Sequence, residues 1–270
     1  MLRRETHSDL FLLQFGEVEA EIQFGEHSST GIAWESTLHR EHMTIREFHD
    51  SFLAEQRETG KNSTESSLKH SSDSRAPVDP LSEDGSVSPR THWGYLSYKH
   101  MRDLFSAPQH REILDWVDWS VVGVEGTGAE STFWLGSAGA YTQCHMDTYG
   151  WNVVAQLHGR KRWTLFAPSN TSMMYATRIP YEESSVFSRV NVAQPDLTQT
   201  PLFASAVPTV IVLNPGDVLY VPKHWWHHVQ CMDAAVSVNM WQASLDDDAD
   251  RLREALVCLY SRFVLRALLI

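Results

Sequence analysis

The second half of this chain is a series of short apolar segments that have the character of β-strands. Glycine and proline separate them, and no regular helices alternate with them. The segments lie at 92–98, 131–136, 152–166, 207–213, 218–221 and 235–241. This pattern indicates an antiparallel sheet folded into a two-layered barrel. We therefore expect a mainly β fold, a double-stranded β-helix of jelly-roll type with peripheral and C-terminal helices, in which 152–166 forms a hairpin that turns at His158–Gly159.

The N-terminal part predicts further strands and one helix. Residues 10–24 alternate partly between apolar and polar, which indicates strands at a sheet edge. Thr44 and Glu47 have the spacing of a capping box, and apolar residues follow at helical intervals up to Leu53. Residues 57–90 are rich in Ser, Thr, Asp, Glu, Gly and Pro, and they bury too little apolar surface to offset the entropy of ordering. A flexible insertion is expected there.

These features divide the chain into four regions. They are 1–56, N-terminal strands and a helix; 57–90, the flexible insertion; 91–245, the barrel core; and 246–270, a C-terminal helix. The last helix opens with acidic residues, which suit its positive N-terminal end, and carries Leu252, Leu256 and Leu259 at helical spacing. The sequence ends in an apolar segment at 268–270, which we expect to pack on the barrel of its own chain. Packing onto a second subunit, with dimerisation through the C-terminal helix, and a chain that is a fragment are the alternatives.

Composition narrows the classes of partner. The net charge of −12 argues against a cationic groove for nucleic acid, so no nucleic-acid partner is expected. The three cysteines (Cys144, Cys231 and Cys258) are too few and too scattered for a disulfide framework or a Cys-x-x-Cys zinc site. No apolar run has the length of a signal sequence or a membrane span, so no membrane partner is expected. We expect a cytoplasmic protein, with the nucleus as a second location.

One short pattern stands out chemically. His145 and Asp147 lie two residues apart, which on a strand places both side chains on the same face. A single pair of this kind occurs by chance in many chains. It gains weight from 216–229, where a Pro-Gly-Asp turn leads to a histidine flanked by tryptophan. Two imidazoles and one carboxylate suit a divalent metal with open positions, and on Fe(II) those positions can accept oxygen and an organic cosubstrate.

Three histidines compete for the third ligand position: His224, His227 and His228. The adjacent pair must point to opposite faces of a strand, so one of the two faces the barrel interior. We assign His227, because Trp225, His227 and Val229 would share an apolar face, whereas His224 lies at a predicted turn. In the alternative, His227 is an ordinary hydrogen-bonded core histidine.

At these residues the sequence resembles the JmjC family of Fe(II)/2-oxoglutarate oxygenases, most closely its hydroxylase-like branch. The resemblance is strong from about 93 to 241 and rests on the segments 142–147, 152–162, 215–228 and 238–241. It implies a cupin barrel of JmjC type, with Fe(II) held by His145, Asp147 and His227 as the catalytic centre. It also implies 2-oxoglutarate as cosubstrate and O2 as oxidant.

The resemblance further implies a set of cosubstrate-binding residues. Lys161 would pair with the distal carboxylate of 2-oxoglutarate, helped by Thr142 and Tyr95, because a buried ammonium neutralises a charge that is costly to desolvate. A solvent-facing lysine is the alternative. Asn152 and Asn239 would contact the cosubstrate or the oxygen at the iron, or else be ordinary buried amides.

The implied reaction is hydroxylation of a side chain of a protein or peptide substrate. Demethylation, which follows when the hydroxylated carbon is attached to nitrogen, is the less favoured outcome. A second hypothesis is a catalytically weak or inactive interaction module, since the likeness extends to a family member that associates with a small heat-shock protein. That makes a small heat-shock protein a candidate partner, although an interaction module has no need of an intact ligand set. A third hypothesis is a cupin that uses another metal without 2-oxoglutarate.

Overall fold

The computed structural model describes residues 11–29, 31–54, 87–89, 91–178 and 185–261. Nearly all of the expected insertion at 57–90 lies outside the described residues, as does the apolar chain end. The boundaries of the four regions therefore stay predictions.

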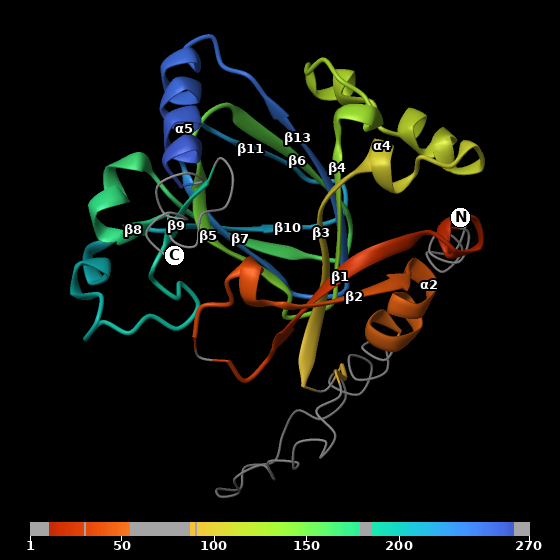
Figure 1. Cartoon of the computed structure of the whole chain (residues 1–270), viewed down its shortest axis with the longest axis horizontal. Helices are drawn as coiled ribbons and strands as arrows, with labels where there is room; N and C mark the ends of the chain where they lie inside the picture. The colour runs from red at the N-terminus through yellow and green to blue at the C-terminus, as the bar shows by residue number, and fades with distance from the viewer. Residues whose placement is uncertain (1–10, 30, 55–86, 90, 179–184, 262–270) are drawn as a thin grey trace, which may run out of the picture.

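Two antiparallel sheets form the body of the structure, which confirms the predicted two-layered barrel (Figure 1). The seven-stranded sheet has the order β11-β6-β13-β4-β3-β1-β2, and the six-stranded sheet has the order β10-β7-β12-β5-β9-β8. The larger sheet contains β1 (Glu19–Glu26), β2 (His39–Thr44), β3 (His92–His100), β4 (Thr132–Gly136), β6 (Trp151–His158), β11 (Val218–Val221) and β13 (Ala235–Gln242). The smaller sheet contains β5 (Tyr141–Asp147), β7 (Lys161–Phe166), β8 (Ala176–Thr177), β9 (Ser185–Ser188), β10 (Thr209–Leu213) and β12 (Trp226–Cys231).

Helices are short and peripheral. Besides a helical segment at residues 11–15, the described α-helices are α2 (Ile45–Phe48), α4 (Met101–Leu104) and α5 (Asp248–Tyr260). A wider π-type turn, η2 (His49–Leu53), continues α2. Single 3₁₀ segments are η1 (Glu35–Thr37), η3 (Pro108–Trp116), η4 (Trp119–Val122), η5 (Gly128–Glu130), η6 (Pro168–Met173) and η7 (Pro201–Ser205). The capping box is confirmed: the Glu47 N–H donates to the Thr44 hydroxyl at 3.1 Å, and the Thr44 N–H donates to the Glu47 carboxylate at 2.8 Å.

The predicted hairpin at 152–166 is wrong. The chain does turn at His158–Gly159, but β6 pairs with β11 and β13, whereas β7 pairs with β10 and β12 in the other sheet. Gly159 makes the tight crossing possible: its φ is +61°, and a Cβ there would lie 2.0 Å from the Ala234 carbonyl oxygen. Alternation along two adjacent segments predicts two strands, but barrel closure decides which strands they pair with.

The predicted strand at the beginning of 10–24 is also wrong, because residues 11–15 are helical. Phe11 and Phe15 lie one turn apart on the buried side of this helix, and their rings contact each other at 5.1 Å between centroids. Leu13, between them, is 74% exposed. Partial alternation over five residues does not distinguish a strand from a helix. The second half of the segment is confirmed as β1.

Apolar clusters lie on both sides of the larger sheet. One cluster joins the N-terminal helix and α2 to its outer face through Phe133, Val153 and Val238. Another lies inside the barrel and joins Val154 and Val221 of the larger sheet to residues of β7, β10 and β12. Residues adjacent in sequence, such as Val153 and Val154, belong to different clusters because successive strand side chains face opposite ways. Three members of the interior cluster, Val154, Trp163 and Val229, also line the cavity of the candidate site.

The C-terminal helix α5 presents its leucines to solvent, and the apolar end at 268–270, for which packing was expected, lies outside the described residues. Leu252, Leu256 and Leu259 are 64%, 58% and 53% exposed, so this stripe does not pack on its own barrel. Polar contacts hold the helix instead, among them the Arg178–Glu254 ion pair at 2.8 Å. Dimerisation through α5 stays a prediction. None of the helices in the described part of the chain combines the length and hydrophobicity that crossing a bilayer requires.

Asp247, directly before α5, ties the helix to the loop that follows β5. Its side chain is 2% exposed, and it accepts hydrogen bonds from the N–H groups of Gly150 (3.0 Å) and Ser244 (2.7 Å) and an ion pair from Lys223 (3.2 Å). Burial alone would raise the pKa of Asp247, but these donors outweigh it and hold the pKa below the usual 3.8. Ionised Asp247 therefore stabilises the fold at neutral pH.

We predict that Asp247→Asn lowers the free energy of unfolding at pH 7 by about 2 kcal/mol, because the substitution removes the charge from a buried, hydrogen-bonded carboxylate. The lowered pKa means that the wild-type contribution is present above about pH 4 and is lost as the pH falls through the folded-state pKa. The difference between the two proteins should therefore shrink in acid. Urea unfolding from pH 3 to pH 7 measures it. Asp246→Asn is the matched control, since that carboxylate contacts the same lysine but is 76% exposed. An equal effect of both substitutions would contradict the assignment.

Candidate metal centre

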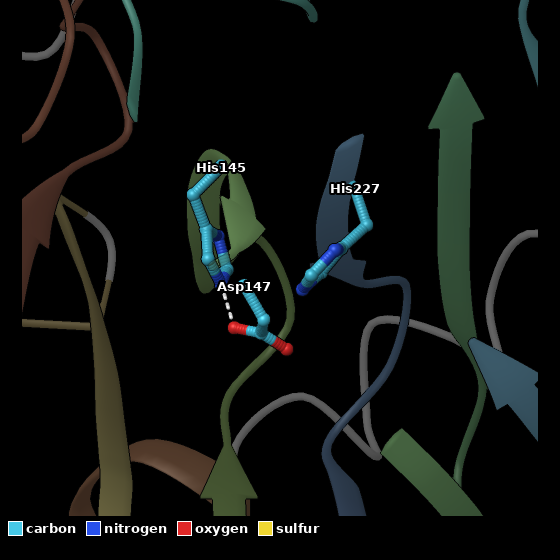
Figure 2. A group of neighbouring side chains, drawn as sticks. All are labelled: His145, Asp147 and His227. Carbon is cyan, nitrogen blue, oxygen red and sulfur yellow. Dashed lines mark ion pairs between the residues drawn. The ribbon is translucent and has the colours of Figure 1, made fainter. Parts of the chain in front are cut away.

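His145, Asp147 and His227 converge on one point inside the barrel (Figure 2). His145 and Asp147 lie on β5, and His227 lies directly opposite His145 on the neighbouring strand β12. One ligand atom from each residue lies within 4.8 Å of the others, and His145 Nε2 is 3.8 Å from Asp147 Oδ1. Two atoms that share an ion through bonds of about 2.1 Å lie at most about 4.2 Å apart, so the separation of His145 and Asp147 fits a common ion as it stands.

Both imidazoles are oriented by the backbone. The Nδ1–H of His145 donates to the Gln143 carbonyl at 2.8 Å, and the Nδ1–H of His227 donates to the Trp225 carbonyl at 3.0 Å. A carbonyl can only accept, so each Nδ1 carries the proton and each Nε2 keeps a free lone pair. Burial, and then the neighbouring His227 ring, lower the pKa of His145 to about 4. His145 is therefore neutral at physiological pH, which is the metal-binding form.

Trp241 orients the carboxylate ligand. Its indole N–H, on β13 of the larger sheet, donates to Asp147 Oδ2 at 2.9 Å. The other oxygen, Oδ1, is the one that faces His145. The sequence pattern at 238–241 included this tryptophan, but nothing in that pattern assigned it a role, because its partner lies in the other sheet.

The two competing histidines lie elsewhere. His228 faces away from the triad and stacks on Tyr141 at 5.4 Å between ring centroids. His224 lies at the expected turn, with a φ of +64°, and its Nε2 is 2.9 Å from the Thr148 carbonyl oxygen. The structure thus places His227, and neither of its neighbours, beside His145 and Asp147.

Lys161 lies within the same cavity and is 2% exposed, so the alternative of a solvent-facing lysine is wrong. Its Nζ donates to Ser237 Oγ at 2.7 Å and to Tyr95 Oη at 3.2 Å. No carboxylate among the described residues forms an ion pair with it, and burial lowers the pKa of Lys161. A buried ammonium with only neutral partners favours an anion in this cavity.

The other predicted residues also line this cavity. Thr142 and Tyr95 are hydrogen-bonded to each other, and burial raises the pKa of Tyr95 well above its usual value. Asn239 donates to Asn152 at 2.8 Å and accepts the indole N–H of Trp134 at 2.6 Å. These contacts fit both hypotheses for the two asparagines, because a satisfied amide can also contact a ligand.

A β-bulge brings Thr142 and His145 to the same face. They are three residues apart, so strict alternation would place them on opposite sides of β5. The pairs His227–His145 and Val229–Thr142 show one extra residue in β5, and this extra residue restores the common face. The cavity is also lined by residues that the sequence did not indicate, among them Tyr98, Trp134, Trp163, Ser237 and Trp241. Trp163 lies two residues after Lys161 on β7, so strand alternation could have identified it as facing the same cavity.

The cavity is small, with a free volume of about 30 Å³, room for about two water molecules. A larger cavity of about 440 Å³ lies at the outer face of the larger sheet, but its lining is almost wholly apolar. The candidate metal site therefore belongs to the smaller cavity, which holds two of the three convergent side chains and the buried lysine.

Comparison with known proteins agrees with this geometry. A family model described as a cupin-like domain matches residues 18–248. HSPB1-associated protein 1 of Bos taurus is 49% identical over 166 residues, which cover 61% of this chain and 34% of the relative. Lysine-specific demethylase 8 of Xenopus tropicalis is 31% identical over 152 residues, covering 55% and 32%. Jumonji C domain-containing protein 5 of Drosophila melanogaster is 31% identical over 151 residues, covering 54% and 36%. The matched part of this chain spans about a third of the length of each of these relatives.

We predict that Trp241→Phe weakens metal binding about tenfold, because the hydrogen bond that orients Asp147 is lost while the ring remains. Calorimetric titration with Mn²⁺ measures the change. Trp119→Phe is the matched control: it also removes a buried indole hydrogen bond, to Ser131 at 2.8 Å, but it lies in the apolar cluster on the outer face of the larger sheet. Equal affinity in both variants would show that Trp241 does not orient the ligand.

Proposed function

This chain belongs to the cupin-like domain family, and from that premise we propose that it is an Fe(II)/2-oxoglutarate-dependent dioxygenase that hydroxylates a side chain of a protein or peptide substrate. The observation that carries the proposal is the pairing of two features in one barrel: three convergent metal-binding side chains, and a buried lysine without a carboxylate partner. Members of the JmjC group generally use this metal and cosubstrate.

The donor set fits Fe(II). Two imidazole nitrogens and one carboxylate oxygen are the protein ligands of non-haem Fe(II) oxygenases, which leave positions open for other ligands. Bound together, Fe(II) and 2-oxoglutarate supply the oxidising power that transfers an oxygen atom from O2 into a C–H bond. His145 and His227 would hold the metal through Nε2, and Asp147 would hold it through a carboxylate oxygen.

The remaining residues fit the binding of a dicarboxylate. Lys161 would neutralise the distal carboxylate, while Tyr95 and Ser237 hold the ammonium in place through the hydrogen bonds described above. Thr142 reaches the same end of the cavity through Tyr95. Asn152 and Asn239 lie on the larger sheet, where they would orient the cosubstrate or the target group.

Aromatic side chains would confine the reaction. Trp134, Trp163 and Trp241 form much of the cavity wall and would exclude water from the reacting groups. Asp147, whose side chain is 17% exposed, lies where the site opens to solvent. We propose that the target side chain approaches the metal from there. We prefer hydroxylation over demethylation because the sequence most closely resembles the hydroxylase-like branch of the family.

A second candidate function is an interaction module with little or no catalysis. Two observations support it: the name of the relative HSPB1-associated protein 1, which describes association with HSPB1, a small heat-shock protein, and the exposed apolar stripe on α5. The intact and pre-oriented triad favours the enzyme. Calorimetric titration with Fe(II) and 2-oxoglutarate separates the two functions, because an interaction module without catalysis has no need to bind either.

We predict that the protein forms succinate from 2-oxoglutarate only when Fe(II) is present, and that His145→Ala or Asp147→Ala abolishes this turnover by removing a metal ligand. Chromatographic detection of succinate under air measures it. His228→Ala is the control, because that imidazole faces away from the triad. Turnover without iron, or turnover that survives in both triad variants, would contradict the proposal.

We predict that Lys161→Met weakens 2-oxoglutarate binding about 100-fold, since it removes the only cation placed to neutralise the distal carboxylate within the described cavity. Methionine keeps most of the volume. Metal affinity should be unchanged, so calorimetry with Mn²⁺ followed by 2-oxoglutarate distinguishes the two steps. Arg160→Met, at an exposed neighbour paired with Asp233 at 2.7 Å, is the control. Unchanged activity in Lys161→Met would favour a cupin that works without 2-oxoglutarate.

A further inference from the structure

Trp163 carries a buried donor that no other group satisfies. It lies on β7, is 5% exposed, and lines the metal cavity. Among the described residues, its indole N–H and the Gln156 side-chain oxygen are the two buried side-chain polar atoms without a hydrogen-bond partner. By contrast, the indole N–H groups of Trp134 and Trp241, which line the same cavity, each have an acceptor. An unsatisfied buried donor costs free energy, so this one requires an explanation.

The position of Trp163 along the barrel supplies one. In the pairing of β7 with β12, Lys161 lies opposite Cys231, Trp163 opposite Val229, and Leu165 opposite His227. Trp163 therefore occupies the level between the buried lysine and the metal-binding histidine. Its ring lies nearly parallel to that of His227, at 5.8 Å between centroids and 25° between planes. A ligand that binds the metal at one end and Lys161 at the other must pass along this indole.

The lining of the cavity points the same way. Trp163, Lys161 and His227 all line it, so a ligand that occupies the cavity lies against the indole. An oxygen-bearing ligand would supply the acceptor that this N–H lacks. We propose that the Trp163 indole N–H donates a hydrogen bond to a carboxylate or keto oxygen of bound 2-oxoglutarate. Trp163 is then a cosubstrate-binding residue, and this inference rests on the proposed function.

Nuclear magnetic resonance tests the contact directly. The protein is labelled with ¹⁵N and loaded with Zn²⁺, which is diamagnetic, and the Trp163 indole resonance is assigned by its absence in Trp163→Phe. On addition of 2-oxoglutarate, this resonance should move downfield as the new hydrogen bond forms. The Trp119 indole resonance should stay in place, because its donor already bonds to Ser131.

Affinity and stability give an independent readout. In Mn²⁺-loaded protein, Trp163→Phe should weaken 2-oxoglutarate binding about tenfold, the loss expected for a hydrogen bond to a charged acceptor. Trp119→Phe should leave the affinity unchanged. The ligand-free Tm of Trp163→Phe should not fall, because phenylalanine removes a donor that had no partner and retains much of the ring.

The outcomes distinguish the role of Trp163 from the proposed function of the whole site. If the wild type binds 2-oxoglutarate but Trp163→Phe binds it equally well and the indole resonance does not move, the role of Trp163 is overturned and the proposed function stands. A fall in Tm with unchanged affinity would equally assign Trp163 a purely structural role. If the metal-loaded wild type does not bind 2-oxoglutarate, the proposed function fails and this inference fails with it.

Discussion

The antiparallel pairing of β5 with β12 is the constraint on which the site depends. It sets His145 opposite His227 and brings Asp147 to the same point from two residues further along β5. Because strand side chains alternate with a period of two, a slip of one residue would turn His227 outward and His228 inward. The sheet register therefore determines which histidine faces the barrel interior. The backbone carbonyls that accept from the two Nδ1 atoms are those of Gln143 in β5 and of Trp225 directly before β12, so the rings are oriented by these strands and their immediate approach.

The barrel interior combines satisfied and unsatisfied polar groups, and the difference is informative. Asn152, Asn239 and Trp134 satisfy one another, and Trp241 is occupied with Asp147. Lys161 has only neutral partners, two hydroxyl groups and the rings of Tyr95 and Trp134, and the Trp163 indole N–H has no hydrogen-bond partner. Fold stability gains nothing from a buried ammonium without a counter-charge or from an unpaired donor. Both are explained if an anion occupies the space between Lys161 and the triad, whereas the apolar clusters on either side of the larger sheet stabilise the barrel itself.

Much of the fold could be predicted because barrel strands are short, apolar and punctuated. The errors came from positions where local pattern and tertiary pairing differ. Residues 152–166 contain two strands and a turn, yet the strands belong to different sheets. Residues 11–15 alternate partly but form a helix, since Phe11 and Phe15 meet the core one turn apart. The helix at the C-terminal end was expected, but only the structure shows that Asp247, Glu254 and their partners hold α5 with its leucines exposed.

The sequence by itself determined which residue types form the site and on which face of its strand each of them lies. The spacing of His145 and Asp147, the inward parity of His227, and the alternation that separates Lys161 from its arginine neighbours all follow from the period of a strand. Only the tertiary structure decided what depends on contacts between distant segments. The bulge in β5 places Thr142 on the face of His145, Trp241 reaches Asp147 from the other sheet, and Trp163 is left beside His227 without an acceptor. Local periodicity encodes which way a side chain points, but its partners are set by which strands the closed barrel places side by side.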